Sequence, residues 1–327
     1  MPPEQTKMIN ISDDNFEKQH VINGVVQTGD ELKQYNYLNL GPTHPATHGI
    51  FQNILKMDGE IIVDAQPTIG YIHRAFEKLA ENRPFFQITT ITDRLNYCSA
   101  PINNIGWHLT MEKLLGIETP KRVDYLRVIV MELARIADHI ICNSVVAVDT
   151  GALTGFLYVF QWREKIYDVY EEICGARLTT NMGRIGGFER DFSKSAFEKI
   201  DVIVKELPKA LQEFEKLVIR NRIFMDRTIN VGGISGERAL EYGFTGPNLR
   251  AAGVDYDVRV MNPYCSYQDF DFTIPVGSNG DTYDRFCVRQ EEMWQSLSII
   301  KQAIKNLPEG KHHADVPEFY LPPKDDV

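Results

Sequence analysis

Apolar and polar positions follow two different periods along this chain, a strand-like period near the N-terminus and a helical period beyond it. In the N-terminal part, the apolar-rich runs 50–57 and 61–65 flank the dipeptide Asp58-Gly59. An Asp-Gly pair between two such runs is a strong signal for a β-hairpin. The pattern therefore predicts a small antiparallel sheet within residues 35–70.

After the predicted sheet, apolar residues recur every three to four positions, as in Ile72, Phe76 and Leu79, which is typical of amphipathic helices. Prolines and glycines punctuate this pattern and indicate where helices end. The predicted helices are, in chain order, about 71–82, 94–115, 120–148, 153–174, 191–219 and 280–307. Residues 85–93 are predicted to be a short linker, and residues 232–279 a loop-rich region with short helix and strand pieces.

The helix predicted from Pro120 has two faces of different character. Its apolar face would be made by Leu126, Ile129, Leu133, Ile136 and Ile140. Glu132, Arg135 and His139 form a second, polar stripe, which we interpret as a solvated or partner-facing surface rather than a site. Because such charges interrupt the most apolar region of the chain, 126–148, we expect a buried helix rather than a membrane span.

These elements predict an α+β fold that is mostly α, in three parts. Residues 1–34 are polar and mixed, and we expect an arm that is part strand and part loose. Residues 35–70 are predicted to form a β subdomain, and residues 71–327 a helical domain. No internal repeat or low-complexity block interrupts this organisation.

Composition and charge narrow the class of protein. With 327 residues, 43% of them hydrophobic, the chain can bury a sizeable core and is predicted to be globular. A net charge of −10 argues against a nucleic-acid binder. The five cysteines are scattered, with no Cys-x-x-Cys pair, which indicates a reducing compartment. The first residues lack the apolar segment of a signal peptide, so we expect membrane association only through a partner.

The predicted loop over residues 38–50 contains two of the eight histidines, His44 and His48. Pro42 and Pro45 disfavour a helix there and stiffen the loop. Two histidines at fixed positions could donate protons or bind a ligand, or they could cap the neighbouring backbone. The residues of the loop alone leave these two interpretations level.

Other chemistries find no support in the residues. Two histidines without a cysteine pair are too few for a metal site, and the cysteines lack the spacing of an iron–sulfur site. There is no Gly-x-Ser-x-Gly elbow, and the glycine-rich bend 175–187 lacks a nucleotide-binding pattern. Cys98 has no cationic neighbour in sequence beyond Arg94, so we interpret it as an inert buried thiol.

Eight segments, taken in order, resemble the motifs of one family, and the first of them runs Leu38-Asn39-Leu40-Gly41-Pro42-Thr43-His44-Pro45-Ala46-Thr47-His48-Gly49. The family is that of the subunit lettered D in NADH–quinone oxidoreductase, respiratory complex I. The matching segments are 38–49, 70–78, 93–97, 111–116, 149–154, 186–187, 249–254 and 280–285. The resemblance covers the chain from about residue 37 to near residue 310, and so many matches in order are specific.

This family is related to the large subunit of nickel–iron hydrogenases, so the resemblance implies a helical bundle of that type. In the hydrogenases the segment equivalent to Arg94–Cys98 carries two metal-binding cysteines, whereas here only Cys98 is present. The resemblance therefore implies that the metal site is lost and that the chain binds no cofactor of its own. It also implies a quinone pocket in that place, at the interface with the subunit that holds the terminal iron–sulfur cluster.

The resemblance further assigns roles to individual residues. Tyr97 and His48 would hydrogen-bond the two quinone carbonyls and donate protons to the reduced quinone. Asp149 would pair with His48, which stabilises the protonated imidazole and fixes the ring. Arg94 would lie near the partner's cluster, where a fixed positive charge favours its reduced form. His44 is expected only to position the loop.

Two departures from the family pattern matter. Thr179 stands where many members have a histidine near the cluster, and a threonine cannot titrate. A low-potential quinone such as menaquinone would suit that change, although ubiquinone remains the other candidate. The family also normally continues with a further helix and a compact C-terminal segment, so the resemblance implies that this segment is missing after Val327.

The resemblance implies that this chain takes no part in electron storage and works within a complex. The expected partners are the cluster-bearing subunit (lettered B in this family of complexes), the subunits lettered C and I, and the membrane subunit lettered H. The expected location is the cytoplasmic face of the bacterial inner membrane, peripheral and held there by partners. Two alternatives remain: a subunit of a hydrogenase-like complex on the same fold, and a structural scaffold whose histidines only cap the backbone.

Overall fold

The computed structural model describes residues 35–316 of the chain. The arm expected over residues 1–34 lies outside the described residues, as do residues 317–327. The chain divides into two compact units, Met1–Glu77 and Lys78–Val327, and we describe each by itself.

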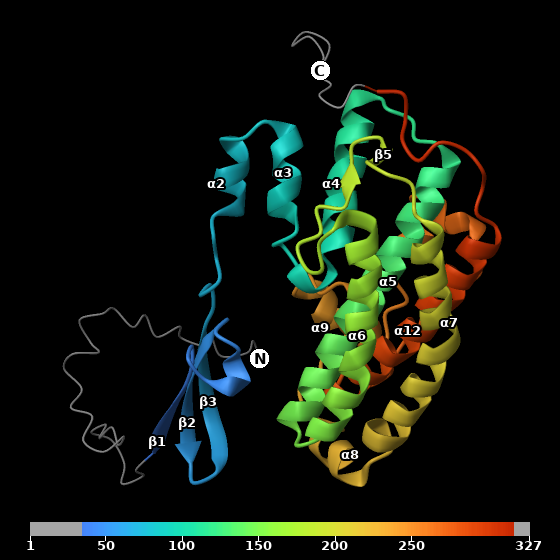
Figure 1. Cartoon of the computed structure of the whole chain (residues 1–327). Coiled ribbons are helices and arrows are strands. Elements are labelled where there is room, and N and C mark those ends of the chain that lie inside the picture. The colour runs from blue at the N-terminus through green and yellow to red at the C-terminus, as the bar shows by residue number, and fades with distance from the viewer. Residues whose placement is uncertain (1–34, 317–327) are drawn as a thin grey trace. The chain divides into compact units, whose positions relative to one another are not determined.

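The first unit contains an antiparallel sheet of three strands in the order β1-β2-β3 (Figure 1). The strands are β1 (Asn36–Leu40), β2 (Gln52–Asp58) and β3 (Ile61–Thr68). Leu55 of β2 lies opposite Leu38 of β1 and Ala65 of β3. Gly59 takes the left-handed conformation with φ +62°, which the tight turn after β2 requires. The predicted hairpin is therefore confirmed.

Helix α2 (Phe76–Glu81) is shorter than the predicted helix over 71–82. The peptide N–H of His73 donates to the carbonyl of Gly70 in a turn, and Ala75 has a φ of +54°. A non-glycine residue in the left-handed region interrupts a right-handed helix. The prediction of helix before Phe76 was therefore wrong, although the apolar spacing there is helical.

Helix α3 (Phe85–Thr92) occupies the segment predicted to be a linker, so that prediction was also wrong. Threonine is a modest helix former, and the segment contains three of them. Contacts with the following helix stabilise α3, because the Asn104 side chain donates to the carbonyl of Thr89 at 3.2 Å. The indole N–H of Trp107 likewise donates to the carbonyl of Phe85. Tertiary packing here overrides local propensity.

Long helices form the second unit, and α5 lies at its centre (Figure 1). They are α4 (Ala100–Leu115), α5 (Lys121–Asp149), α6 (Leu153–Cys174), α7 (Lys194–Phe214) and α12 (Thr282–Lys305). Helix α5 packs against α12, α6 and α4. The predicted apolar face of α5 is confirmed, because each of its five residues is at most 1% exposed. The mostly helical fold with a small N-terminal sheet is thus as predicted.

Helix ends in this unit follow ordinary capping chemistry. Gly116 ends α4 with a φ of +64°, and its N–H donates to the carbonyl of Glu112. The hydroxyl of Ser193 accepts the N–H of Ala196 at the start of α7. Helix α7 continues into a π-helical turn, Glu215–Ile219. Most predicted boundaries of the long helices lie close to the observed ones. The start predicted at Arg94 was wrong, because the 3₁₀ turn Tyr97–Ser99 precedes α4 and the helix begins at Ala100.

The glycine-rich bend after α6 forms a tiny hairpin, β4 (Gly183–Arg184) and β5 (Gly187–Phe188). A buried ion pair between Arg127 of α5 and Glu112 of α4 anchors it, because Glu112 also accepts the N–H of Gly186 at 2.6 Å. Gly187 allows the close approach of the later chain, since a Cβ there would lie 2.4 Å from the carbonyl oxygen of His312. The glycines of this bend are explained by packing.

Short helices fill the region between α7 and α12. They are α8 (Arg222–Thr228), α9 (Gly236–Glu241), α10 (Gly246–Ala251), α11 (Val258–Met261) and the 3₁₀ helix η4 (Tyr267–Asp269). The described residues of 232–279 contain no strand, so the predicted strand pieces there were wrong. Gly280 closes this region on itself, because a Cβ would lie 2.1 Å from the carbonyl oxygen of Ile234.

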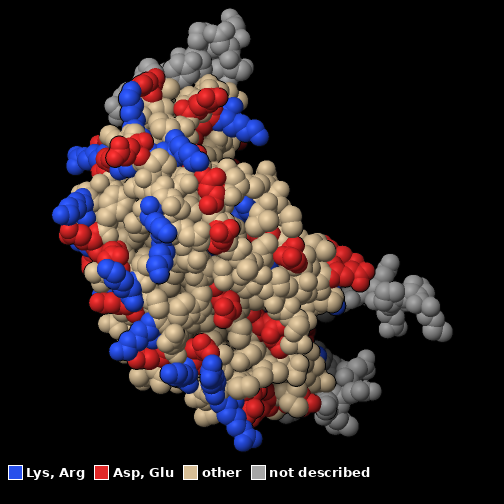
Figure 2. Space-filling model, turned by 90° about the vertical axis from the view of Figure 1, so that its right-hand side faces the viewer, with Lys and Arg blue, Asp and Glu red and all other residues tan. Residues whose placement is uncertain are grey.

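The outer surface carries acids and bases side by side. Figure 2 shows Lys and Arg interleaved with Asp and Glu on one face. On α6 and α7, Lys199 pairs with Glu172 at 2.9 Å and Lys165 with Glu206 at 3.5 Å. Such exposed pairs contribute little to stability. The face in Figure 2 therefore presents no field of a single sign.

Candidate functional site

The histidine loop of the first unit joins β1 to β2 through one 3₁₀ turn, Pro45–Thr47. The sequence disfavoured any helix here, so this short turn corrects that expectation. Proline is tolerated because it occupies the first position of the turn, where no backbone N–H is needed. Buried Thr47 fixes the loop, since its hydroxyl lies 3.1 Å from the carbonyl oxygens of both Pro42 and His44.

The two histidines of this loop differ in their contacts. The Nδ1 atom of His44 accepts the N–H of Ala46 at 3.1 Å, so His44 caps the turn. His48 follows the turn in the left-handed conformation with φ +53°, and it is exposed. Neither of its ring nitrogens has a hydrogen-bond partner among the described residues. His44 thus holds the loop, while His48 is exposed and makes no ring hydrogen bond within residues 35–316.

Tyr97 of the second unit stands at the start of a 3₁₀ turn, Tyr97–Ser99, that leads into α4. It is 43% exposed, and its hydroxyl has no hydrogen-bond partner in the described part of the chain. The preceding Asn96 accepts the N–H of Cys98 through its side-chain oxygen at 3.3 Å. A rigid turn therefore presents a phenol whose donor and acceptor capacity is unused.

Arg94 lies on the turn between α3 and Tyr97, and it is exposed. The neighbouring Asp93 is buried, and its carboxylate accepts the N–H of Asn181 at 3.4 Å. Burial raises the pKa of Asp93, against the backbone hydrogen bond from Asn181. This contact brings the Arg94 turn beside the segment that contains Thr179.

Thr179 lines a hollow of about 470 Å³ in the second unit, together with Thr180 and Asn181. The hydroxyl of Thr180 and the side-chain oxygen of Asn181 are both buried without a partner among the described residues. The contact between Asp93 and Asn181 joins the turn of Arg94 to the segment of Thr179, and the expected place of both residues near a partner's cluster stays a prediction.

Asp149 is the last residue of α5 and is exposed. The helix ends there because the hydroxyl of Thr150 turns back to the carbonyls of Val146 and Ala147. Asp138, which contacts the Tyr97 turn, precedes Asp149 by eleven residues of α5, or about 16 Å of helix. Asp149 therefore lies about three turns of α5 beyond the point where the Tyr97 turn contacts that helix. His48 and His44 belong to the other unit, and each unit stands by itself.

The polar stripe of α5 is buried, which corrects the sequence interpretation of a solvated or partner-facing surface. Glu132 is fully buried and accepts hydrogen bonds from the hydroxyls of Tyr267 at 2.5 Å and Ser296 at 2.6 Å. It also pairs with Arg259 at 3.1 Å and Arg135 at 3.3 Å. Burial alone would raise the pKa of Glu132, but the two guanidinium groups and the hydroxyl donors lower it to about 2.

A second buried acid extends this arrangement. Glu292 of α12 accepts from His139 at 2.6 Å and from Arg250 at 2.7 Å. Burial opposes ionisation, yet these partners lower the pKa of Glu292 to about 2. Asp257 completes the set, because it holds Arg259 through two oxygens. We call these residues the ionic cluster: Glu132, Arg135, His139, Arg250, Asp257, Arg259 and Glu292.

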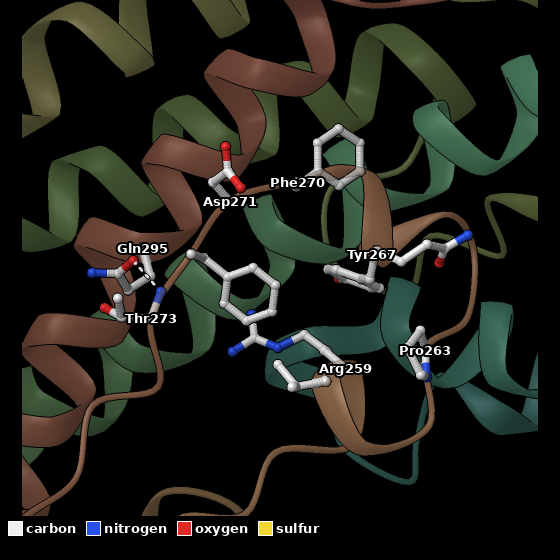
Figure 3. A pocket seen from close by; sticks show the side chains of 10 residues that line it. Arg259, Pro263, Tyr267, Phe270, Asp271, Thr273 and Gln295 are labelled. Carbon is white, nitrogen blue, oxygen red and sulfur yellow. Dashed lines mark hydrogen bonds between the residues drawn. The ribbon is translucent and has the colours of Figure 1, made fainter.

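A groove of about 590 Å³ lies beside the ionic cluster (Figure 3). The rings of Tyr267, Phe270 and Phe272 line it. Arg259 also lines it, but its guanidinium is already engaged by Asp257 and Glu132. The groove therefore offers aromatic surface and no free charge from that arginine, and we assign it no chemistry.

The five cysteines are all free thiols. Burial raises the pKa of the Cys98 thiol, and the nearby Asp138 carboxylate raises it further. A raised pKa leaves little reactive thiolate near neutral pH. Between residues 35 and 316, no group of three or more histidine, cysteine or acidic residues is placed to hold a metal ion. In the same range no helix is long and apolar enough to cross a membrane.

Comparisons with known proteins agree on one family. Residues 149–327 match the model of the 49 kDa subunit of respiratory-chain NADH dehydrogenase. The D-lettered subunit of NADH-quinone oxidoreductase from Flavobacterium johnsoniae is 73% identical over 302 residues, which are 92% of this chain and 73% of that protein. The subunit lettered D 2 from Cytophaga hutchinsonii is 74% identical over 293 residues, 89% of this chain and 75% of that protein. The subunit lettered C/D from Bdellovibrio bacteriovorus is 48% identical over 94% of this chain and 55% of that protein.

Proposed function

Because the chain belongs to the family of the 49 kDa, or D-lettered, subunit of NADH-quinone oxidoreductase, we propose that it forms the quinone site of that complex. The observation that carries this proposal is the exposed, unpartnered hydroxyl of Tyr97 on a rigid turn. A phenol that a fixed support holds out without a partner in the described part of the chain suggests contact with a ligand. A quinone carbonyl is an acceptor that such a phenol can bind.

Quinone reduction needs two electrons and two protons. We propose that this chain supplies the protons, from the Tyr97 phenol and from the His48 imidazole, both of which can act as general acids. The electrons come from the iron–sulfur cluster that the neighbouring subunit holds. In this proposal, Tyr97 and His48 bind the two carbonyls of one quinone, and each gives one proton as the quinone is reduced.

Three further residues support these two. Asp149, exposed at the end of α5, pairs with His48 and holds its ring in the productive orientation. His44 positions the loop, since its Nδ1 already caps the 3₁₀ turn. Arg94, exposed beside the Thr179 segment, places a fixed positive charge toward the partner's cluster. Thr179 adds no titratable group there, which suits a menaquinone better than a ubiquinone.

We also propose the assembly in which this site works. The C/D protein of Bdellovibrio bacteriovorus favours the subunit lettered C as one partner of this chain. The subunits lettered B, I and H are the remaining proposed partners, with the chain on the cytoplasmic side of the inner membrane. Attachment is peripheral in this proposal, through the partners.

The test compares single substitutions in the assembled complex. Tyr97→Phe and His48→Ala should each lower quinone reduction by about a hundredfold, since general acid catalysis contributes about that much. NADH oxidation by ferricyanide, which needs no quinone, should stay at the wild-type rate. Tyr256→Phe is a matched control, because Tyr256 is 44% exposed and Tyr97 is 43% exposed.

Survival of quinone reduction in both variants would favour the scaffold alternative, in which the histidines only cap backbone. A hydrogenase-like role would instead appear as nickel in the purified complex, measured by metal analysis. Either result would overturn the proposed function.

A further inference from the structure

The Tyr97 turn rests on one carboxylate of the central helix. Asp138 of α5 accepts a hydrogen bond from the side-chain nitrogen of Asn96 at 3.2 Å. The Asp138 side chain is 29% exposed, and its other oxygen lies 3.8 Å from the Nδ1 atom of His139. Asp138 raises the pKa of Cys98, after burial, which agrees with a carboxylate placed directly under this turn. In the described residues, Asp138 has no lysine or arginine within ion-pair distance.

Asn96 transmits this contact to the turn. Its side-chain nitrogen also donates to the hydroxyl of Ser99 at 2.8 Å, and its side-chain oxygen accepts the N–H of Cys98. Its carbonyl accepts the N–H of Ser99 at 3.2 Å and the side-chain N–H of Asn103 at 3.1 Å. Five hydrogen bonds therefore meet at the residue immediately before Tyr97. Rotation of Asn96 would move the backbone that carries the phenol.

We propose that Asp138 is a positioning residue for Tyr97 and acts through Asn96. Helix α5 is packed on several sides by other helices, so the backbone that carries the Asp138 carboxylate is held in place. The Asn96 side-chain nitrogen has two donor hydrogens, and Asp138 and Ser99 each take one. Without Asp138, the Asn96 amide loses its contact with α5, and only Ser99 and Cys98 of its own turn still hold it. This inference rests on the proposed function, because it concerns the phenol assigned to the quinone carbonyl.

What Asp138 supplies here is an acceptor atom, and its charge is not needed. The substitution Asp138→Asn would retain that atom, because an amide oxygen accepts the same hydrogen bond. The substitution Asp138→Ala would remove it. The conservative substitution therefore separates positioning by hydrogen bonding from an electrostatic effect of the carboxylate on the phenol.

The experiment uses the assembled complex and measures the ratio of quinone reduction to ferricyanide reduction, both from NADH. Asp138→Ala should lower kcat for quinone reduction by about ten- to a hundredfold, since an error near 1 Å at a reacting group has that cost. Asp138→Asn should recover most of this loss. The ratio matters because a general folding defect would lower both activities together.

Asp124→Ala is the matched control on the same helix. Asp124 also accepts side-chain hydrogen bonds, from Thr119 at 3.1 Å and from Ser266 at 3.3 Å, but it precedes Asp138 by fourteen residues of α5. Its ratio of activities should equal the wild-type ratio. Asp138→Ala combined with Tyr97→Phe should be no worse than Tyr97→Phe alone, because the positioned group is already gone.

The outcomes separate the two proposals. If Tyr97→Phe leaves quinone reduction intact, the proposed function fails. If Tyr97→Phe is impaired but Asp138→Ala is not, only the present inference fails. Equal impairment in Asp138→Asn and Asp138→Ala, or additive losses in the double variant, would also overturn it.

Discussion

Helix α5 contacts two polar regions, the ionic cluster and the turn that carries Tyr97, and these differ in how their side chains are paired. The ionic cluster is buried, and Glu132 alone has four hydrogen-bonding or charged partners. On another side of the same helix, the turn that carries Arg94 and Tyr97 is exposed, and these two side chains have no hydrogen-bond partner among the described residues. Buried polar groups are nearly always paired, so the cluster indicates architecture. Exposed and unpaired side chains on a rigid support indicate a surface where a ligand or partner supplies the contacts.

The sharpest way to break this comparison is to remove the acid at the centre of the ionic cluster. Glu132→Ala leaves Arg259 and Arg135 without their shared carboxylate, and removing one partner of a buried ion pair costs about 3–5 kcal/mol. We expect a matching loss in the free energy of unfolding, which thermal melting would show as a lower melting temperature. We also expect a lower yield of purified, assembled complex. Glu198→Ala is the control, because that side chain on α7 is 67% exposed, and it should melt like the wild type. A Glu132→Ala complex with unchanged melting would contradict the architectural role.

Acid should weaken the ionic cluster. The pKa values of Glu132 and Glu292 are about 2 in the folded protein, below the ordinary 4.5. The unfolded chain therefore binds protons more strongly, so the stabilisation is complete above pH 4.5 and is lost as the pH falls toward 2. The free energy of unfolding, measured between pH 6 and pH 3, should decrease once the pH is lower than 4.5. Glu132→Gln should flatten that slope, and an unchanged slope would exclude Glu132 as its source.

A smaller effect is expected at the edge of the cluster. His139→Ala removes one hydrogen bond to Glu292, but Arg250 still pairs with that acid at 2.7 Å. One lost partner of a charged group costs about 1–3 kcal/mol, less than the loss of Glu132. Thermal melting of the complex should rank Glu132→Ala as the less stable variant. The reverse order would place the centre of the cluster at Glu292.

The smallest effect on stability is expected at the exposed turn. Arg94→Ala removes a side chain without a partner among the described residues, so the free energy of unfolding should change by no more than about 0.5 kcal/mol. Quinone reduction should nevertheless fall, while ferricyanide reduction is kept. Arg222→Ala, at a side chain that is 92% exposed, should change neither activity. If the Arg94→Ala complex lost stability and both activities together, the turn would have a structural role like that of the ionic cluster, and the proposed difference between the two regions would be wrong.

The long helices and the hairpin could be predicted because their signals are local. The Asp58-Gly59 turn and the apolar face of α5 both follow from spacing within a few residues. The stripe of α5 could not be placed correctly, because its partners lie far along the chain: Arg259 is 127 residues from Glu132. A polar stripe looks the same in sequence whether water or a distant arginine covers it.

The site residues came from the resemblance to a family, and residue pattern alone left the histidines undecided. The difference between His44 and His48 needed coordinates, because only a structure shows which ring caps the backbone. The sequence also gave no indication that Asn96 and Asp138 support the Tyr97 turn. A local signal for Asn96 existed, since asparagine is a common cap before a helical turn, but nothing in the sequence joins it to a carboxylate 42 residues later.

The long reach of the ionic cluster also bears on how the protein is made. Glu132 leaves the ribosome 164 residues before Ser296, which is roughly 10–30 s at ordinary rates of synthesis. For the first 127 of those residues, neither α12 nor the Arg259 segment has been made, so neither can cover the stripe. Its charges then keep one side of an otherwise apolar helix in contact with water, and the stripe is covered only once α12 has been made. We therefore expect the polar stripe that stabilises the finished protein also to limit aggregation of the unfinished chain.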